Sequence, residues 1–143
     1  MVKTHSTDNE LLFLPLGGTE EIGMNFNLYG YGKPKKHDWI IIDLGITFSD
    51  DITPGVDVIL PDPAFIVERK DQLAGIILTH GHEDHLGGVP YLWDKLRCPV
   101  YATPFTAALL RSKLEFVESA KSMEIIEVPL MGKFDIGPFS IEL

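Results

Sequence analysis

The sequence predicts a layered α/β fold, and three observations support that prediction. Short apolar runs bounded by glycine, proline and polar residues are typical of strands. Segments in which apolar residues recur at near-helical spacing are typical of helices that pack on one face. Because 45% of the 143 residues are hydrophobic, the chain can also bury one substantial core, so we expect a single domain over residues 10–143.

The first half of the chain is expected to form an antiparallel meander. Residues 1–9 are polar and unpatterned, so this start, which includes His5, is expected to fray. Pro15 places the first strand near a sheet edge or a strand end, because proline cannot donate to a strand ladder. The strands of the meander are predicted at residues 11–16, 24–31 and 39–43.

The segment after the meander has a different composition. Residues 48–63 are rich in aspartate and proline, which predicts an irregular excursion at the lip of a cleft. Residues 64–72 carry Phe65, Ile66 and Val67 ahead of a charged run. We therefore expect a short helix there, covering one face of the sheet.

The second half alternates strands and helices. A second helix is expected at residues 90–95, and a third after Thr103, with Thr103 as its N-cap and Pro104 at its first position. Strands are predicted at residues 74–78, 99–102, 124–130 and 139–143. The apolar residues of the third helix recur at near-helical spacing and are expected to face the core: Phe105, Ala108, Leu109 and Leu114.

The segment from Thr79 to His85, T-H-G-H-E-D-H, gathers side chains that bind metals. It follows a predicted strand, so His80 and His82 project to the same side if extended geometry continues for a residue or two. Asp84 and His85 come where the chain can turn into a helix, so this pair can point at a neighbouring position. Imidazole nitrogens with carboxylate oxygens, and no thiolate, favour zinc or manganese in a catalytic site that is left open to water.

A histidine-rich surface loop is the alternative interpretation of this segment. Its positions nevertheless fit one ligand pattern, H-x-H-x-D-H, and the pattern follows a strand as it requires. Glu83 falls outside the pattern and is expected to be solvated. The sequence therefore predicts a metal-binding loop at residues 79–85.

This loop at a strand-to-helix junction resembles the signature of the metallo-β-lactamase superfamily. Residues 17–25, G-G-T-E-E-I-G-M-N, resemble the glycine-rich loop of the β-CASP nucleases, most of all that of bacterial ribonuclease J. Met24 is a departure, since those proteins often carry lysine there. Residues 39–45, W-I-I-I-D-L-G, resemble the superfamily strand that ends in an acid, with Asp43 as that acid.

The resemblance implies a role for each matching residue. His80 and His82 would hold one metal ion, and Asp84 and His85, the expected catalytic pair, would hold a second. Two zinc ions are expected, with manganese as the alternative. Asp43 is expected to bond to backbone amides or ring N–H groups of the loop and orient its imidazoles, with an ordinary turn acid as the alternative. The residues expected to shape the floor of the active site are Gly17, Gly18, Glu21 and Asn25.

The resemblance also implies an αββα sandwich that hydrolyses RNA, internally or from the 5′ end, with a metal-activated water. In that superfamily a later half of the sequence closes the sandwich and supplies further ligands, and no histidine follows His85 here. We therefore expect an amino-terminal half that lacks the β-CASP insertion and turns over little by itself. Its exposed apolar area would favour a homo-oligomer.

The net negative charge of this chain is unfavourable for binding RNA. Lys plus Arg is 12 and Asp plus Glu is 21, a net charge of −9, whereas proteins that grip phosphate backbones usually present a basic face. Bound cations would reverse the sign locally. The basic cluster at residues 33–37 is expected to be an exposed hairpin tip, with an RNA contact as the alternative.

The remaining features narrow the class of protein. There is no signal-peptide pattern and no apolar run near the ~18 residues of a membrane helix, so we expect a cytoplasmic protein without a membrane partner. Cys98 is the only cysteine and is expected to be a small buried hydrophobe. Two alternatives to the nuclease stay open, namely a hydrolase of thioesters or lactams with the same metal loop, and a non-catalytic, self-associating fragment.

Overall fold

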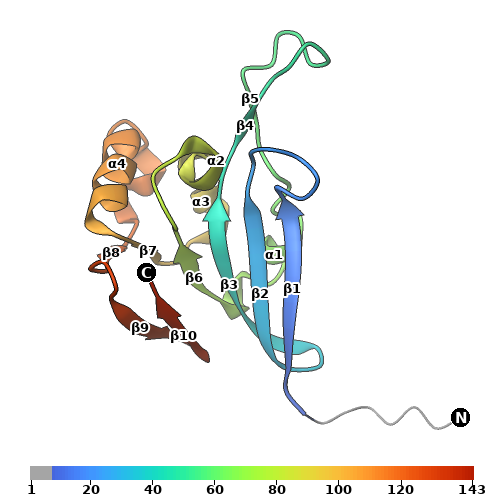
Figure 1. Ribbon diagram of the computed structural model, residues 1–143, viewed down its shortest axis with the longest axis vertical. Coiled ribbons are helices and arrows are strands. Elements are labelled where there is room, and N and C mark those ends of the chain that lie inside the picture. Colours follow the sequence, from blue (N-terminus) through green and yellow to red (C-terminus); the bar gives the residue numbers. More distant parts are fainter. Residues whose placement is uncertain (1–7) are drawn as a thin grey trace, which may run out of the picture.

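The amino-terminal strands form the antiparallel meander that the sequence predicts. In the computed structural model, which describes residues 8–143, β1 (Glu10–Gly17) pairs with β2 (Phe26–Lys33), and β2 pairs with β3 (Lys36–Leu44) (Figure 1). The frayed start predicted for residues 1–9 lies outside the described residues, apart from Asp8 and Asn9.

Parallel strands extend this meander into one six-stranded sheet. β6 (Leu73–Ile77) lies parallel to β3, and β7 (Val100–Ala102) and β8 (Ile125–Glu127) follow, in the order β1-β2-β3-β6-β7-β8. Parallel neighbours need crossover connections, which helices supply here. Because β3 and β6 run in the same direction, the residues that follow them meet at one edge of the sheet (Figure 1).

Helices cover one face of the sheet. They are α1 (Ala64–Val67), α3 (Val89–Leu96) and α4 (Pro104–Leu114), with 3₁₀ turns η1 (Lys70–Gln72) and η2 (Glu118–Ser122). Burying each large apolar side chain between these layers contributes about 1.5–3 kcal/mol. The fully buried residues of this core include Phe26, Leu28, Ile41, Ile76, Leu86, Val89, Val100 and Leu110.

A hairpin covers part of the opposite face. β9 (Lys133–Ile136) and β10 (Phe139–Glu142) place Ile136 against Ile40 and Ile77, and the Phe134 ring stacks on Tyr101 at 4.8 Å between centroids. Towards β1, the described part of this face stays open, and Phe13 is exposed. The layered α/β class predicted from the sequence is therefore confirmed. No helix in the described part of the chain has the length and apolar character needed to span a membrane.

Several predicted elements were wrong in detail. The excursion at residues 48–63 contains a small ribbon of β4 (Thr47–Phe48) and β5 (Val58–Ile59), and the helix predicted at residues 64–72 is divided into α1 and η1. β9 was missed, because its four residues pair only with β10, at the end of a tight turn.

The buried face of α4 was predicted only in part: Leu114 packs against the core and Leu109 is partly buried, as expected. Phe105 is 72% exposed and Ala108 is exposed, whereas Thr106, Ala107 and Leu110 are buried. Both sets have helical spacing, so periodicity alone does not distinguish them. The small side chains of Thr106 and Ala107 allow the helix to approach the sheet at β7 and β8.

Candidate metal centre

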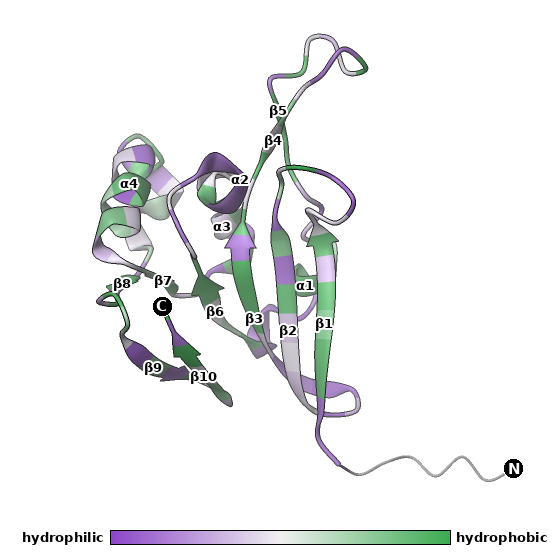
Figure 2. Ribbon diagram, in the orientation of Figure 1, coloured by the Kyte–Doolittle hydropathy of each residue, from purple (hydrophilic) through white to green (hydrophobic). Residues whose placement is uncertain are grey.

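The predicted metal-binding loop, residues 79–85, lies at the carboxyl ends of β3 and β6. Leu78 ahead of it is fully buried, and α2 (Glu83–Leu86) begins after His82, its N-cap residue. Figure 2 shows that α2 is hydrophilic whereas β6 beside it is hydrophobic. The loop therefore holds polar side chains directly above an apolar core.

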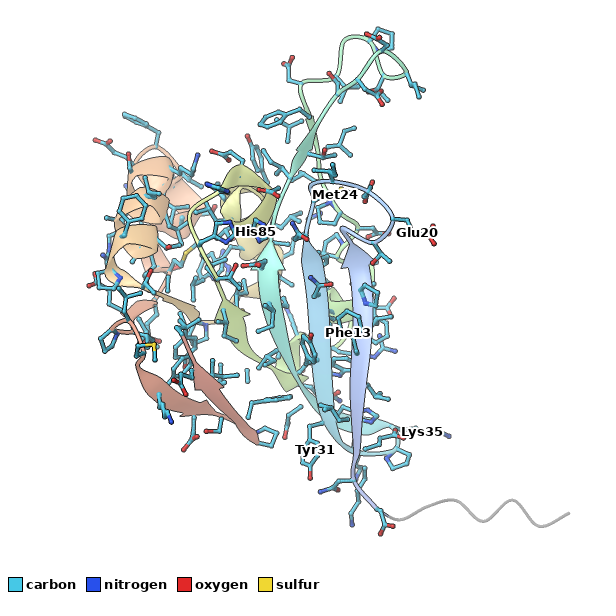
Figure 3. All side chains as sticks on the ribbon, viewed as in Figure 1. Phe13, Glu20, Met24, Tyr31, Lys35 and His85 are labelled. Carbon is cyan, nitrogen blue, oxygen red and sulfur yellow. The ribbon has the colours of Figure 1, made fainter. Side chains whose placement is uncertain are left out.

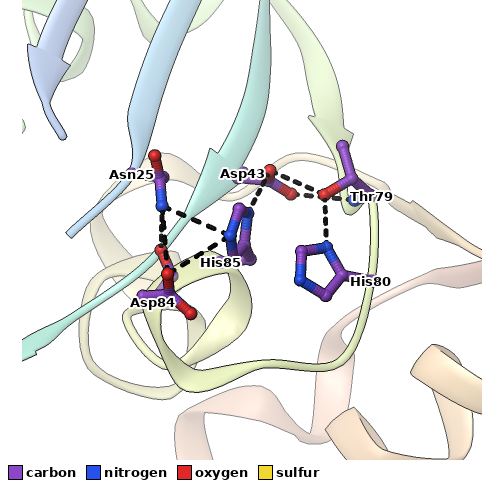
Figure 4. A network of polar contacts seen from close by, with 6 residues as sticks. All are labelled: Asn25, Asp43, Thr79, His80, Asp84 and His85. Carbon is purple, nitrogen blue, oxygen red and sulfur yellow. Dashed lines mark hydrogen bonds and ion pairs between the residues drawn. The ribbon is translucent and has the colours of Figure 1, made fainter. Parts of the chain in front are cut away.

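Asp43 connects this loop to the end of β3. Its backbone is left-handed, with a φ of 65°, a strained conformation that aspartate tolerates better than most residues. Its carboxylate, 6% exposed, accepts hydrogen bonds from the Thr79 N–H at 2.8 Å, the Thr79 hydroxyl at 2.8 Å and Nδ1 of His85 at 2.7 Å (Figure 4). The expected contacts of Asp43 are thus present, and its role towards a metal stays a prediction.

These bonds determine which nitrogen of each neutral ring carries the proton. A carboxylate only accepts, so Nδ1 of His85 donates to Asp43 and Nε2 keeps its lone pair. The one hydroxyl hydrogen of Thr79 goes to Asp43, so Thr79 Oγ1 accepts from Nδ1 of His80 at 3.0 Å. Nε2 of His80 then also keeps its lone pair. One carboxylate therefore presents two imidazoles in the tautomer that binds metals.

The free nitrogen of His85 faces the carboxylate of Asp84. Nε2 lies 3.3 Å from Asp84 Oδ2 and 3.3 Å from the amide nitrogen of Asn25. That amide also donates to the Asp84 carbonyl oxygen at 3.0 Å, which holds the residue in place. The Asn25 amide nitrogen, 3.3 Å from Nε2 and 3.4 Å from Oδ2, donates to both atoms, and a cation could take over that role. The pair therefore fits a metal with nitrogen and oxygen ligands.

The rings of His80, His82 and His85 form one cluster. His82 lies edge-on to His80 with 4.6 Å between centroids, and His80 is 4.0 Å from His85. Within residues 8–143, no group of three or more His, Cys, Asp or Glu side chains stands ready to hold one ion.

Backbone contacts hold the loop from behind. The N–H of Asn25 donates to the Asp84 carbonyl at 2.9 Å, and that of Ile46 to the Glu83 carbonyl at 3.0 Å. Gly45 passes so close to α2 that an added Cβ would lie 1.7 Å from the Asp84 carbonyl oxygen. Only glycine fits at this crossing.

Asn25 is the part of the glycine-rich loop that contacts the cluster. An added Cβ would lie 2.3 Å from the Met24 carbonyl oxygen at Gly17 and 2.7 Å from Asn25 Oδ1 at Gly18, and Gly18 N–H donates to Glu21 at 3.4 Å. Figure 3 shows Met24 at the same end of the sheet as His85. Gly17, Gly18 and Glu21 therefore shape the loop that presents Asn25.

Glu83 is not simply solvated, as the sequence suggested. Its carboxylate forms an ion pair with Lys113 on α4, and both side chains are partly exposed. This pair links α2 to α4. Glu83 therefore has a cationic partner of its own, outside the ligand pattern.

Comparison with known proteins identifies the family. A model described as the metallo-beta-lactamase superfamily matches residues 33–139, which include Asp43 and the whole metal-binding loop. This chain belongs to the metallo-β-lactamase superfamily. The match confirms the resemblance found in the sequence, and membership of the superfamily supports metal binding at the loop.

Curated superfamily relatives of this chain are ribonucleases J. Ribonuclease J of Sinorhizobium meliloti is 50% identical over 135 residues, which are 94% of this chain and 24% of that protein. Ribonuclease J2 of Bacillus subtilis is 37% identical over 127 residues, which are 89% of this chain and 22% of that protein. The chain thus spans about a quarter of the length of the curated relatives it matches.

A solved structure agrees with the superfamily fold. The crystal structure of Zn²⁺-bound PqqB from Methylobacterium extorquens matches with a TM-score of 0.50 and 19% identity, covering 78% of this chain and 36% of that one. At this identity the likeness concerns the fold alone. It confirms the metallo-β-lactamase-type architecture that the sequence predicted.

Two residues of the site were missed from the sequence. Thr79 was seen only as the end of a strand, yet its hydroxyl connects Asp43 to His80. Gly45 was noted only as part of a motif, yet it makes the close crossing behind α2 possible. A hydroxyl residue directly before the first histidine, and a glycine shortly after a strand-ending acid, were the available signals.

Proposed function

We propose that the protein is a metal-dependent ribonuclease that hydrolyses RNA phosphodiesters, internally or from the 5′ end. The supporting observation is the pair of facing acceptors, His85 Nε2 and Asp84 Oδ2, held 3.3 Å apart between Asp43 and Asn25. An imidazole nitrogen and a carboxylate oxygen so placed can bind one cation in place of the Asn25 amide. The similarity to proteins named ribonuclease J suggests the substrate class.

In this proposal the loop residues divide between two ions. His80 and His82 would hold one, and Asp84 and His85 the other, with zinc expected and manganese as the alternative. Bound ions of this kind polarise a phosphoryl oxygen and lower the pKa of a bound water to about 7. Asp43 keeps the Nε2 lone pairs of His80 and His85 available, and the Asn25 amide holds Asp84 towards His85.

Charge explains why cations are needed at this site. The protein carries a net charge of −9, Glu20 lies at the same end of the sheet as His85 in Figure 3, and the Asp84 carboxylate lies 3.3 Å from the His85 ring. The basic cluster at residues 33–37 lies at the opposite end, where Figure 3 labels Lys35, and His37 pairs with Glu10 at 2.9 Å. Bound cations would therefore supply the positive charge that attracts phosphate.

The proposal is tested with the full-length polypeptide and its His82→Ala/Asp84→Ala double variant. We expect the double variant to lose bound zinc, measured by elemental analysis, and to lose cleavage of 5′-monophosphorylated RNA. Glu83→Gln is the matched control, because it changes an acid of α2 that pairs with Lys113, and it should keep both. Unchanged zinc and RNA cleavage in the double variant, or consumption of a thioester with RNA left intact, would contradict the proposal.

We also propose that this chain self-associates. Leu11 and Phe13 are exposed on the open part of the sheet, and Phe13 packs only against Tyr29, at 5.1 Å between centroids, among the described ring contacts. Apolar surface of this kind promotes association. Light scattering should detect a dimer or larger assembly, and Phe13→Lys should shift it towards monomer. A monomeric wild-type chain would disprove this idea.

A further inference from the structure

A hollow lies beside the metal-binding loop, at the amino-terminal end of α4. Its volume is about 360 Å³, at the lower end of the roughly 300–1,000 Å³ typical of small-molecule pockets. Large apolar side chains on its walls, Phe105 and Leu130, are exposed to solvent. The residues that line it are Thr103, Pro104, Phe105, Pro129 and Leu130.

Phe105 connects this hollow to the loop. Gly81 stands between His80 and His82, and a Cβ added there would lie 3.8 Å from Phe105 Cε1 and 2.5 Å from Leu109 Cδ1. The first turns of α4 therefore pack directly on the backbone between two candidate ligands. A group bound in the hollow would contact Phe105, the side chain that lies near the backbone at Gly81.

The lining favours a flat, uncharged group. None of the residues that line the hollow carries a charge, so they offer no ionic partner for phosphate. A phenylalanine face exposed to solvent is a surface on which nucleobases stack, and proline and leucine side chains pack well against flat rings. Base stacking on an aromatic face needs no charged side chain at the point of contact.

We propose that this hollow receives a nucleobase of the RNA strand, adjacent to the phosphate at the metal-binding loop, with Phe105 as the stacking surface. The inference rests on the proposed ribonuclease function. It assigns phosphate binding to the loop and base binding to the hollow beside it. It also accounts for an exposed phenylalanine at a position where the helical pattern predicted a buried one.

The test is a thermodynamic cycle between the protein and the RNA. Fluorescence anisotropy measures binding of phosphorothioate RNA oligonucleotides, which resist hydrolysis, to the zinc-loaded full-length polypeptide and to its Phe105→Ala variant. One oligonucleotide is complete, and the others each carry one abasic position. Phe105→Ala should weaken binding of the complete RNA roughly tenfold, the size of one stacking contact. One abasic position should weaken wild-type binding equally, with no further loss in Phe105→Ala.

Controls separate stacking from general damage. Phe116 follows α4, is 91% exposed and does not line the hollow, so Phe116→Ala should bind RNA as the wild type does. Phe105→Tyr should keep most of the affinity because it keeps an aromatic face. Zinc content should be the same in Phe105→Ala and the wild type, which shows an intact loop.

The outcomes are distinguishable. Additive losses at every abasic position, or an equal loss in Phe116→Ala, overturn the hollow as a base site and leave the ribonuclease proposal standing. A wild-type protein that binds no RNA overturns the ribonuclease proposal and this inference with it.

Discussion

Two segments that leave the same edge of the sheet are held very differently. The metal-binding loop is fixed by the Asp43 carboxylate in front and by backbone bonds from Asn25 and Ile46 behind. The arm of β4 and β5 projects away from the domain with Phe48, Ile52 and Val56 exposed (Figure 1). An added Cβ meets an atom at 1.7 Å at Gly45, behind the loop, and nothing within 4 Å at Gly55, in the arm. Close packing at this edge is thus concentrated on the segment that carries the candidate ligands.

Gly45→Ala, behind the metal-binding loop, should lower the unfolding free energy more than any other substitution considered. The new Cβ would overlap the Asp84 carbonyl oxygen, which is backbone and cannot rotate away, so we expect a loss of more than about 4 kcal/mol in unfolding free energy, or no folded protein. Urea denaturation followed by tryptophan fluorescence measures it. Gly55→Ala is the control. Its φ of +83° should cost only about 1–2 kcal/mol. Equal losses of unfolding free energy in the two variants would mean that the backbone behind the loop is packed no more closely than the arm.

Cys98, in the core on the packed side of the sheet, should make the stability of the protein depend on pH. Burial raises the pKa of its thiol from 9.0 to about 12. Between these pH values the unfolded chain releases a proton that the folded chain keeps, so stability should decline by about 3 kcal/mol as pH rises from 9 to 12. Cys98→Ala should lack this part of the decline in denaturation at matched pH values. A wild-type thiol that reacts at once with a thiol reagent at pH 8 would show that the residue is not packed away.

Asp43→Asn should have the next largest effect, which is a loss of metal affinity. The asparagine amide cannot accept hydrogen bonds from both the Thr79 hydroxyl and the His85 ring as the carboxylate does. Neither His80 nor His85 would then be held in the tautomer that leaves Nε2 free to bind a metal. Loss of such an orienting group typically lowers metal affinity roughly 10- to 100-fold. Zinc titration calorimetry measures it. Asp38→Asn, an exposed acid on the same strand, is the matched control and should bind zinc normally. Equal affinities of the Asp43→Asn variant and the wild type would mean that Asp43 is only a turn acid.

Thr79→Val should have the smallest effect of the four. It removes one hydroxyl donor from Asp43 and the acceptor of His80, at a cost of about 1 kcal/mol. The sharper measurement is ¹⁵N NMR of the rings, where His80 should lose its single tautomer while His85 keeps its own. Thr79→Ser retains the hydroxyl and should restore the wild-type spectrum. If His80 stays unchanged in the valine variant, the connection through Thr79 is wrong.

The sequence was informative where structure depends on neighbours along the chain. The meander, the buried strand ahead of Thr79 and the ligand pattern from His80 to His85 are local features, and they are found where the patterns place them. The contacts of Asp43 were expected only in kind, because Thr79 and His85 lie far from it in the sequence. Patterns along a chain do not specify distances between such residues.

Other features could not be predicted from local patterns. Two helical faces of α4 have apolar residues at suitable spacing, and contact with the loop at Gly81 and with the sheet decides which is buried. The close approach of Gly45 to α2 arises only when the carboxyl ends of β3 and β6 meet. Both features depend on tertiary packing.

The oxygen Oδ2 of Asp43 accepts hydrogens from both the Thr79 hydroxyl and the His85 ring. A protein engineer who wished to recruit a different ion through one imidazole would therefore disturb the other, since both depend on the same atom. Position 43, and not the histidines themselves, is where such a redesign would have to begin.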